Sequence, residues 1–224
     1  MSRPAPVSQS ARLRLARYHC FLEELLNDVH SRSITSREMA TQLGVTEESV
    51  RSDISRVDIK GRPGEGYDIE ALHVALAAFL GLSAQSPFIV VGGLPMLEAL
   101  PVVFPAAEFG MRPIAYFSER EQDVGSVVGD IEVRPLSAIA SMGSQPSNTV
   151  ALVACEPGRV DETLGALSVA GINGVLMLTP RLRPVHPEGM QVTYFRIPCA
   201  LKSLAASSLC ATEPAASTHA CCEQ

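Results

Sequence analysis

Apolar residues in the first third of the chain recur at helical spacing, with polar residues between them. In the stretch ARLRLARYHCFLEELLNDV this stripe consists of Leu15, Tyr18, Phe21, Leu22, Leu25 and Leu26. Such spacing predicts an amphipathic helix with one buried face. A second helix is predicted to begin at TSRE, where Thr35 can cap the helix and Glu38 stands three residues later, as in a capping box.

A third predicted helix follows a glycine turn. Gly44 permits a tight turn after the second helix, and Thr46 can cap the next one, whose apolar residues Val50, Ile54 and Val57 share one face. Two helices joined by a short glycine turn are typical of the helix-turn-helix. The glycine-dense stretch KGRPGEGYDI comes next, begins with basic residues and suits a two-stranded wing along a phosphate backbone. The pattern therefore predicts an N-terminal winged helix.

The face of the third helix opposite its apolar residues is polar and basic. In a winged helix this face enters the major groove, where Arg51 or Arg56 can hydrogen-bond guanine edges. The candidate DNA contacts of the helices and the wing are Arg37, Thr46, Ser49, Arg51, Ser52, Ser55, Arg56, Lys60 and Arg62. The alternatives are a solvated helix face or a protein-binding trihelical domain, and Glu47 and Glu48 lie close to where DNA would lie.

After GLSAQSP the pattern changes to alternating strands and helices. Short apolar runs occur in PFIVVGG, RPIAYFS, GDIEVRPL, NTVALVACEP and INGVLMLTP, with helical segments such as 159–170 between them. Strands joined by helical crossovers predict an α/β fold with a doubly wound, parallel, Rossmann-like sheet whose ligand lies at the carboxyl ends of the strands. We therefore expect a winged helix over 1–81, a Rossmann-like domain over 86–196, and a C-terminal helix with a cysteine-containing tail over 197–224.

The segment IVVGGLPMLEAL resembles the start of a dinucleotide-binding unit with part of its signature missing. Gly92 and Gly93 keep the turn, but Leu94 and Leu97 replace the second and third glycines of the fingerprint. Pro95 suits the first turn of the following helix, whose N-terminus retains a partial positive charge for an anion.

The acid expected after the second strand of a dinucleotide site is also displaced, because AYFSER offers Ser118 and then Glu119. By itself this motif is weak evidence for NAD. A Rossmann-like sheet with a closed or altered site is the alternative.

Composition and charge narrow the class of protein. With 224 residues and 46% apolar residues the chain can form a real core, and six scattered cysteines suggest reduced thiols. No stretch approaches the ~20 apolar residues that span a bilayer, and the first residues lack the apolar region of a signal peptide, so we expect a cytoplasmic protein without membrane contact. Basic and acidic residues are equal in number through Asp68, so the net charge of −6 belongs to the remainder. Any polyanion is therefore expected to bind the first third.

Taken together, YHCFLEELL, ITSREMATQLGVTEESVRSDIS, GRPGEGYDIEAL and AGINGVLMLTPRLRPVHPEGMQV resemble the Rex family of redox-sensing transcriptional repressors, in the same order and at comparable spacing. The resemblance implies a homodimer with an N-terminal winged helix and a C-terminal Rossmann domain that binds NADH or NAD. It also implies binding to a palindromic operator in double-stranded DNA, which NADH releases. In relatives a C-terminal helix is swapped between subunits, and IPCALKSLAASS is the candidate segment here.

The resemblance also assigns residues. Arg51 and Asp53 match an Arg-x-Asp pattern of the recognition helix, while Ser52 replaces a basic residue and Pro63 interrupts the basic pair of the wing. The family's acid after the second strand falls on Ser118. The candidate nucleotide-binding residues are Gly92, Gly93, Leu94, Pro95, Met96, Leu97, Ser118, Glu119, Cys155, Glu156, Pro157, Thr179 and Pro180. Because the departures cluster at ligand contacts, the NADH response is expected to be weakened, altered or lost.

Two further hypotheses remain open. The tail has soft metal ligands at Cys210, His219, Cys221 and Cys222, so a Rex-like regulator that has lost its NADH response can instead sense thiol oxidation or metal. Their spacing matches no regular zinc pattern, so no metal site is predicted. The second hypothesis is a Rossmann-fold oxidoreductase. No histidine is expected near the nucleotide cleft beside an acid, so we predict no catalytic residues and no enzymatic activity.

Overall fold

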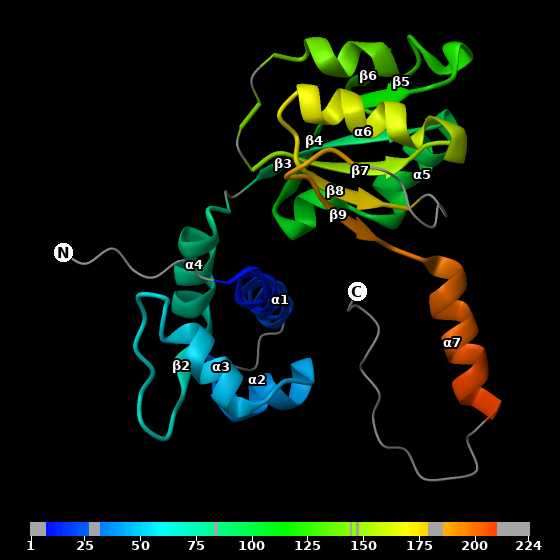
Figure 1. Ribbon diagram of the computed structural model, residues 1–224. Coiled ribbons are helices and arrows are strands. Elements are labelled where there is room, and N and C mark those ends of the chain that lie inside the picture. The colour runs from blue at the N-terminus through cyan, green and yellow to red at the C-terminus, as the bar shows by residue number, and fades with distance from the viewer. Residues whose placement is uncertain are drawn as a thin grey trace. The chain divides into compact units, whose positions relative to one another are not determined.

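The computed structural model describes residues 8–26, 32–82, 85–143, 145–146, 148–178 and 186–209. Contacts divide the chain between Ser83 and Ala84 into two compact units. The first unit consists mainly of helices, and the second contains the large sheet (Figure 1).

The described part of the first unit contains the predicted helices and a small antiparallel sheet. Its elements are α1 (Gln9–Leu26), β1 (Ser33–Ile34), α2 (Ser36–Leu43), α3 (Glu47–Ile54), β2 (Tyr67–Asp68) and α4 (Ile69–Leu80). The capping box of Thr35 and Glu38 is present, Gly44 ends α2 with a φ of 66°, and Thr46 caps α3 through the backbone N–H of Ser49. The local signals in the sequence therefore place these helices correctly.

The wing differs from the predicted pair of strands within one segment. Its strand β2 pairs instead with β1, which precedes α2, while the stretch itself holds an isolated bridge between Arg62 and Gly66. Gly66 has a φ of +85°, and a Cβ there would lie 2.2 Å from the carbonyl oxygen of Ile34. Only glycine allows the two strands to approach this closely in that conformation.

The core of the first unit follows the predicted apolar stripes. Leu15, Tyr18 and Leu22 of α1 are buried, while Leu26 at the end of the helix is exposed. These side chains pack with the buried residues of α2, α3 and α4 in one cluster. Because α3 gives its apolar face to this cluster, its opposite face is left at the surface.

The second unit alternates strands with helical segments. Its described strands are β3 (Ser86–Gly92), β4 (Met111–Ser118), β5 (Val127–Val128), β6 (Ile131–Pro135), β7 (Val150–Ala154), β8 (Gly174–Met177) and β9 (Gln191–Tyr194). Its α-helices are α5 (Leu94–Val103), α6 (Val160–Val169) and α7 (Ile197–Leu209). Short 3₁₀ segments lie between them: η1 (Ala106–Phe109), η2 (Glu121–Asp123), η3 (Leu136–Ser141) and η4 (Pro157–Arg159).

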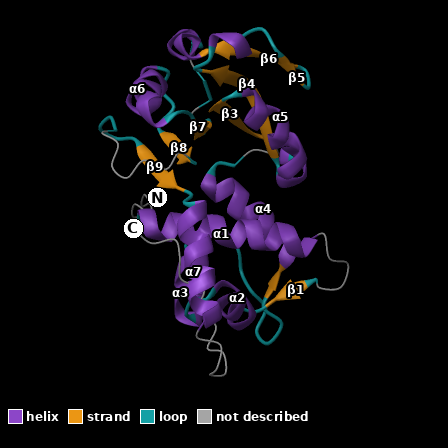
Figure 2. Ribbon diagram, turned by 90° about the vertical axis from the view of Figure 1, so that its right-hand side faces the viewer, coloured by secondary structure: helices purple, strands orange, loops and turns teal. Residues whose placement is uncertain are grey.

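The described strands form a seven-stranded sheet in the order β5-β6-β4-β3-β7-β8-β9. All neighbouring pairs are parallel except β5 and β6, which form an antiparallel edge. Ile89 and Val91 of β3 pack in the cluster that contains α6, and Phe88 and Val90 pack in the cluster that contains α5. Figure 2 shows α5 and α6 on opposite sides of the sheet. The predicted doubly wound fold is therefore confirmed.

The chain order reverses direction in the sheet between β3 and β7. From β3 the chain proceeds outward through β4 and β6, and it then returns to β7 on the other side of β3. A crevice at the carboxyl ends of the strands at such a reversal is where open α/β sheets bind ligands. None of the described helices is long and apolar enough to cross a membrane.

Candidate functional sites

The exposed face of α3 carries the predicted DNA contacts of this helix. Arg51, Ser52, Ser55 and Arg56 are exposed, while Val50 and other apolar residues of the same helix are buried. The hydroxyl groups of Thr46 and Ser49 lie 2.7 Å apart at the start of α3, which Thr46 caps by accepting the backbone N–H of Ser49. The helix thus presents two cations and several hydroxyl groups on one surface, a chemistry suited to phosphates and base edges.

A buried carboxylate fixes α3 against α1. Asp53 Oδ2 and Oδ1 accept hydrogen bonds from Arg14 Nε at 2.7 Å and Nη2 at 2.8 Å, and Oδ2 also accepts one from the Tyr18 hydroxyl at 3.1 Å. Burial, reinforced by the charge of Asp53, raises the pKa of Tyr18 to about 12. Asp53 of the Arg-x-Asp pattern is therefore a positioning residue for the helix, and Arg51 is the member of the pattern that faces outward.

The other predicted DNA contacts are exposed as well. Arg37 lies on α2, and Lys60 and Arg62 lie in the wing segment. Arg62 forms an exposed ion pair with Glu65 at 3.4 Å, and Arg51 forms one with Glu47 at 3.1 Å. Such pairs are worth little in water, so a phosphate can replace the carboxylate at small cost.

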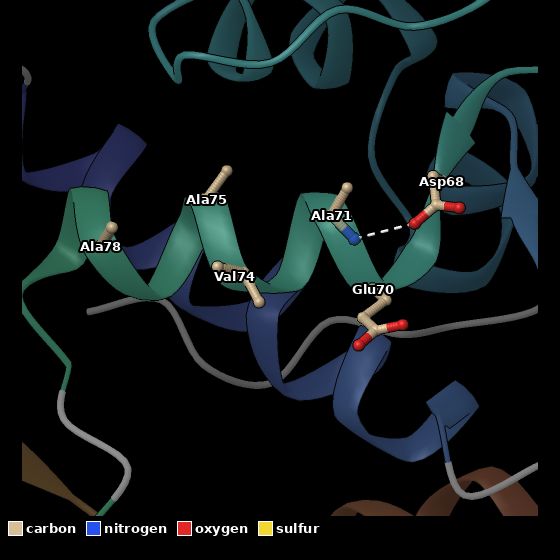
Figure 3. A pocket seen from close by; sticks show the side chains of 6 residues that line it. All are labelled: Asp68, Glu70, Ala71, Val74, Ala75 and Ala78. Carbon is tan, nitrogen blue, oxygen red and sulfur yellow. Dashed lines mark hydrogen bonds between the residues drawn. The ribbon is translucent and has the colours of Figure 1, made fainter.

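The exposed side of α4 has a different chemistry. A shallow hollow there is lined by Asp68, Glu70, Ala71, Val74, Ala75 and Ala78 (Figure 3). Asp68 caps the helix by accepting the backbone N–H of Ala71 at 2.9 Å. With two carboxylates and no cation in its lining, this surface does not suit a polyanion.

In the second unit, the turn between β3 and α5 is closely packed at its two glycines. A Cβ on Gly92 would lie 3.2 Å from Met96 Sδ and 3.5 Å from the carbonyl oxygen of Ala154, and a Cβ on Gly93 would lie 3.3 Å from Arg120 Nη1. The backbone at both positions has ordinary negative φ, so these glycines are distinguished by close approach rather than by conformation.

The leucines of the loop lie largely against the core. Leu97 is fully buried, and half-buried Leu94 packs against the same cluster between α5 and the sheet. Pro95 is exposed in the first turn of α5, as predicted, and Met96 is half-buried. The Leu97 side chain, which replaces the third glycine of the fingerprint, is therefore accommodated by packing between α5 and the sheet.

The segment after β4 supplies a carboxylate that sequence reasoning missed. Asp123 Oδ2 accepts the hydroxyl of Ser118 at 2.7 Å and the backbone N–H of Leu94 at 2.9 Å. These contacts, with the hydrogen bond from Ser118 first, hold the pKa of Asp123 below its usual value. A carboxylate thus stands beside Ser118, where the family's acid is expected, although it comes from five residues later. No periodic pattern signals a contact between residues 94 and 123.

Two side chains join the end of β4 to the loop after β7, with β3 between these strands in the sheet. Glu119 Oε1 accepts the backbone N–H of Glu156 at 3.0 Å, and Arg120 Nη2 donates to Glu156 Oε1 at 3.1 Å. Glu119 Oε2 is buried without a partner among the described residues. Sequence reasoning identified Glu119 and Glu156 but not Arg120, whose position over Gly93 depends on the sheet order.

Of the remaining candidate residues, some lie within the described part of the chain and others outside it. Cys155 is buried in the core cluster that contains α6, and Pro157 begins η4. Thr179 and Pro180 lie outside the described residues, as do the four tail residues Cys210, His219, Cys221 and Cys222.

Known proteins resemble the chain over most of its length, although no protein-family model matches it. A redox-sensing transcriptional repressor Rex of Clostridium tetani is 27% identical over 191 residues, which cover 85% of this chain and 89% of the relative. A Rex of Thermoanaerobacter pseudethanolicus is 28% identical over 181 residues, 80% of each chain. Among solved structures, RSP, a Rex-family repressor, has a TM-score of 0.72 at 24% identity and covers 91% of this chain and 94% of its own. RSP in complex with β-NAD⁺ and operator DNA has a TM-score of 0.71 at 25% identity, with coverage of 91% and 93%.

Proposed function

Because this chain is homologous over most of its length to redox-sensing repressors named Rex, we propose that it is a sequence-specific DNA-binding transcriptional repressor that responds to the NADH/NAD ratio. The observation that carries the proposal is the likeness of this winged helix and doubly wound sheet, over 91% of the chain, to RSP, which has been solved with β-NAD⁺ and operator DNA. Binding of NADH to the second unit releases the DNA from the first.

In this proposal the exposed face of α3 reads the operator. Arg51 and Arg56 donate to base edges in the major groove, while Arg37, Lys60 and Arg62 contact phosphates. The exposure of all five side chains supports these roles. Asp53 contributes indirectly, because its hydrogen bonds to α1 hold α3 in place.

The residues at the crevice fit NAD(H) with a changed set of contacts. The carboxylates of Asp123 and Glu119 beside the turn are acceptors for ribose hydroxyl groups. When bound, the dinucleotide supplies the redox state that the regulator reads. The contact of Asp123 with the Leu94 N–H removes a donor that a glycine loop offers to the pyrophosphate, so we expect weaker binding than with a complete fingerprint.

We propose that the repressor acts as a homodimer in the cytoplasm, where it meets a palindromic operator of matching two-fold symmetry. Helix α7 supports dimerisation, because it exposes the apolar residues Ile197, Leu201 and Leu204. A swap of this helix between subunits is the arrangement we expect. Light scattering of the purified chain measures the subunit number, and a monomer at operator-binding concentrations would contradict this part of the proposal.

We propose no catalytic role, in keeping with the description of the relatives as transcriptional repressors. Consumption of NADH in the presence of common 2-hydroxy or 2-oxo acids would overturn this statement.

Fluorescence anisotropy of a labelled duplex with a Rex-type palindrome tests the main proposal. The chain is bound at low salt, and NADH or NAD⁺ is then added. Release by NADH but not by NAD⁺ is expected. Arg51→Ala should weaken binding roughly tenfold or more, as expected for the loss of a base contact, whereas Arg112→Ala, an exposed change in β4, should leave it unchanged. DNA binding that ignores NADH would contradict the nucleotide response and redirect attention to the cysteine tail.

A further inference from the structure

The first turn of α5 offers a phosphate few backbone donors. The N–H of Leu94 is donated to Asp123 at 2.9 Å, Pro95 has no N–H, and the N–H of Met96 is donated to the carbonyl oxygen of Gly93 at 3.0 Å. The N–H of Leu97 is directed to the same oxygen. An ordinary helix N-terminus binds anions through such groups, but here they already have acceptors.

The charge of Asp123 also opposes an anion at this helix end. Its carboxylate is buried, and the hydrogen bond from Ser118 keeps its pKa low, so it is ionised at neutral pH. A negative charge at a helix N-terminus offsets the partial positive charge of the helix dipole. A phosphate at the crevice therefore needs a cation from another part of the chain.

Arg120 brings a cation against the turn. The position that a Cβ of Gly93 would take lies 3.3 Å from its Nη1, 3.4 Å from its Cζ and 3.7 Å from its Nε. The flat side of the guanidinium therefore lies over the glycine. Its Nη2 reaches Glu156 Oε1 on the loop after β7, so the side chain reaches from the end of β4 past β3 to this loop.

We propose that Arg120 is the phosphate-binding residue of this crevice and that a phosphate group of the bound dinucleotide displaces Glu156 from it. The inference rests on the proposed nucleotide response and explains how a loop with leucines in place of two glycines still binds an anionic ligand. In this chain the Arg120 side chain replaces the backbone N–H donors of the fingerprint.

The energetics favour this exchange. Arg120 and Glu156 are 42% and 58% exposed in their side chains, so their ion pair is screened by water and costs little to break. A guanidinium donates two parallel hydrogen bonds to a phosphate. The pyrophosphate carries two negative charges in total, and a ribose phosphate carries close to two, whereas the carboxylate of Glu156 carries one. The exchange leaves Glu156 in solvent, where its charge is hydrated. The contact of Glu119 with the N–H of Glu156 holds the loop after β7 near the site in either state.

Two phosphate groups can fulfil this role. The pyrophosphate is common to NADH and NADPH, whereas NADPH has an additional phosphate on the adenosine ribose. Arg120 follows the end of β4 by two residues, and an arginine in this region accommodates the ribose phosphate in other dinucleotide sites. If Arg120 binds the pyrophosphate, the binding of both nucleotides depends on it. If it binds the ribose phosphate, only the binding of NADPH does.

Titration of the full-length chain with NADH and NADPH, followed by isothermal calorimetry at low salt, tests the proposal. Arg120→Gln should weaken binding roughly tenfold or more, the loss expected for a charge-assisted hydrogen bond. An equal loss for both nucleotides identifies the pyrophosphate, and a loss confined to NADPH identifies the ribose phosphate. Arg120→Lys should restore part of the affinity, because it keeps the charge but not the paired donors. Arg112→Gln on the opposite end of β4 is the control.

A second variant, Glu156→Gln, tests whether Glu156 competes with the phosphate for Arg120. It removes the competing carboxylate, so the phosphate should bind about two- to fivefold more tightly, the strength of an exposed ion pair. If the bridge served only to hold the loops together, both Arg120→Gln and Glu156→Gln would weaken binding. That result, or unchanged affinity of Arg120→Gln for both nucleotides, overturns the inference while leaving the proposed function intact. Absence of binding by the unmodified chain overturns both, and melting temperatures verify that the variants are folded.

Discussion

Replacement of Arg14 by alanine tests how the recognition helix is held. The change leaves the Asp53 carboxylate, which is 2% exposed, with the Tyr18 hydroxyl as its remaining hydrogen-bond donor among the described residues. Removing one partner of a buried ion pair costs about 3–5 kcal/mol. Because the Arg14 side chain is 32% exposed, water can reach part of the vacated space, so we expect the lower end, about 3 kcal/mol.

The assay is urea denaturation followed by far-ultraviolet circular dichroism, in which the helical first unit contributes strongly. The matched control is Glu47→Gln, which breaks the exposed pair between Glu47 and Arg51 on α3 and should cost less than about 0.5 kcal/mol. Operator binding should fall with Arg14→Ala, because α3 loses its attachment to α1. A loss of stability below about 1 kcal/mol, or one equal to that of the control, would refute the view that the buried carboxylate depends on Arg14.

Three further changes have definite expected outcomes. Leu94→Gly should tighten NADH binding by removing bulk beside the turn, and identical titrations of the two proteins would contradict this. Gly66→Ala should weaken operator binding in anisotropy measurements, because a Cβ there clashes with the carbonyl oxygen of Ile34; unchanged binding would show that the wing is not needed. Burial, with a smaller contribution from His73, lowers the pKa of His19 to about 4. In the unfolded chain the His19 imidazole takes up a proton near pH 6.5, whereas in the folded chain it stays neutral until about pH 4. The free energy of unfolding should therefore fall as the pH drops from about 6.5 towards 4. In urea denaturation across this range, the free energy of unfolding of His19→Phe should depend less steeply on pH than that of the unmodified chain. An equal slope for the two proteins would exclude His19 as the cause.

Local sequence signals determined the helices of the first unit. The capping box of Thr35 and Glu38, the turn at Gly44 and the cap at Thr46 each act within a few residues, so they can be recognised without the fold. The exposed face of α3 follows from the same periodicity, because burial of one side of a helix leaves the other in solvent. The alternating strands and helices of the second unit likewise imply a parallel sheet.

The strand pairing of the wing and the attachment of α3 were not predictable in this way. The pairing of β1 with β2 and the hydrogen bonds between Arg14 and Asp53 join residues more than thirty positions apart. Nothing in the spacing of an arginine and an aspartate indicates that they meet across two packed helices.

The candidate nucleotide site likewise has features that the sequence determined and contacts that depend on the tertiary structure. The glycine turn and the first turn of α5, which contains Pro95, are local, and the sequence alone determined them. The carboxylate beside Ser118 and the cation over Gly93 come from Asp123 and Arg120, whose positions depend on the order of β4, β3 and β7 in the sheet. Tertiary structure alone decided these contacts, because charged side chains have no periodic signature and acquire partners only when the strands that carry them are brought together.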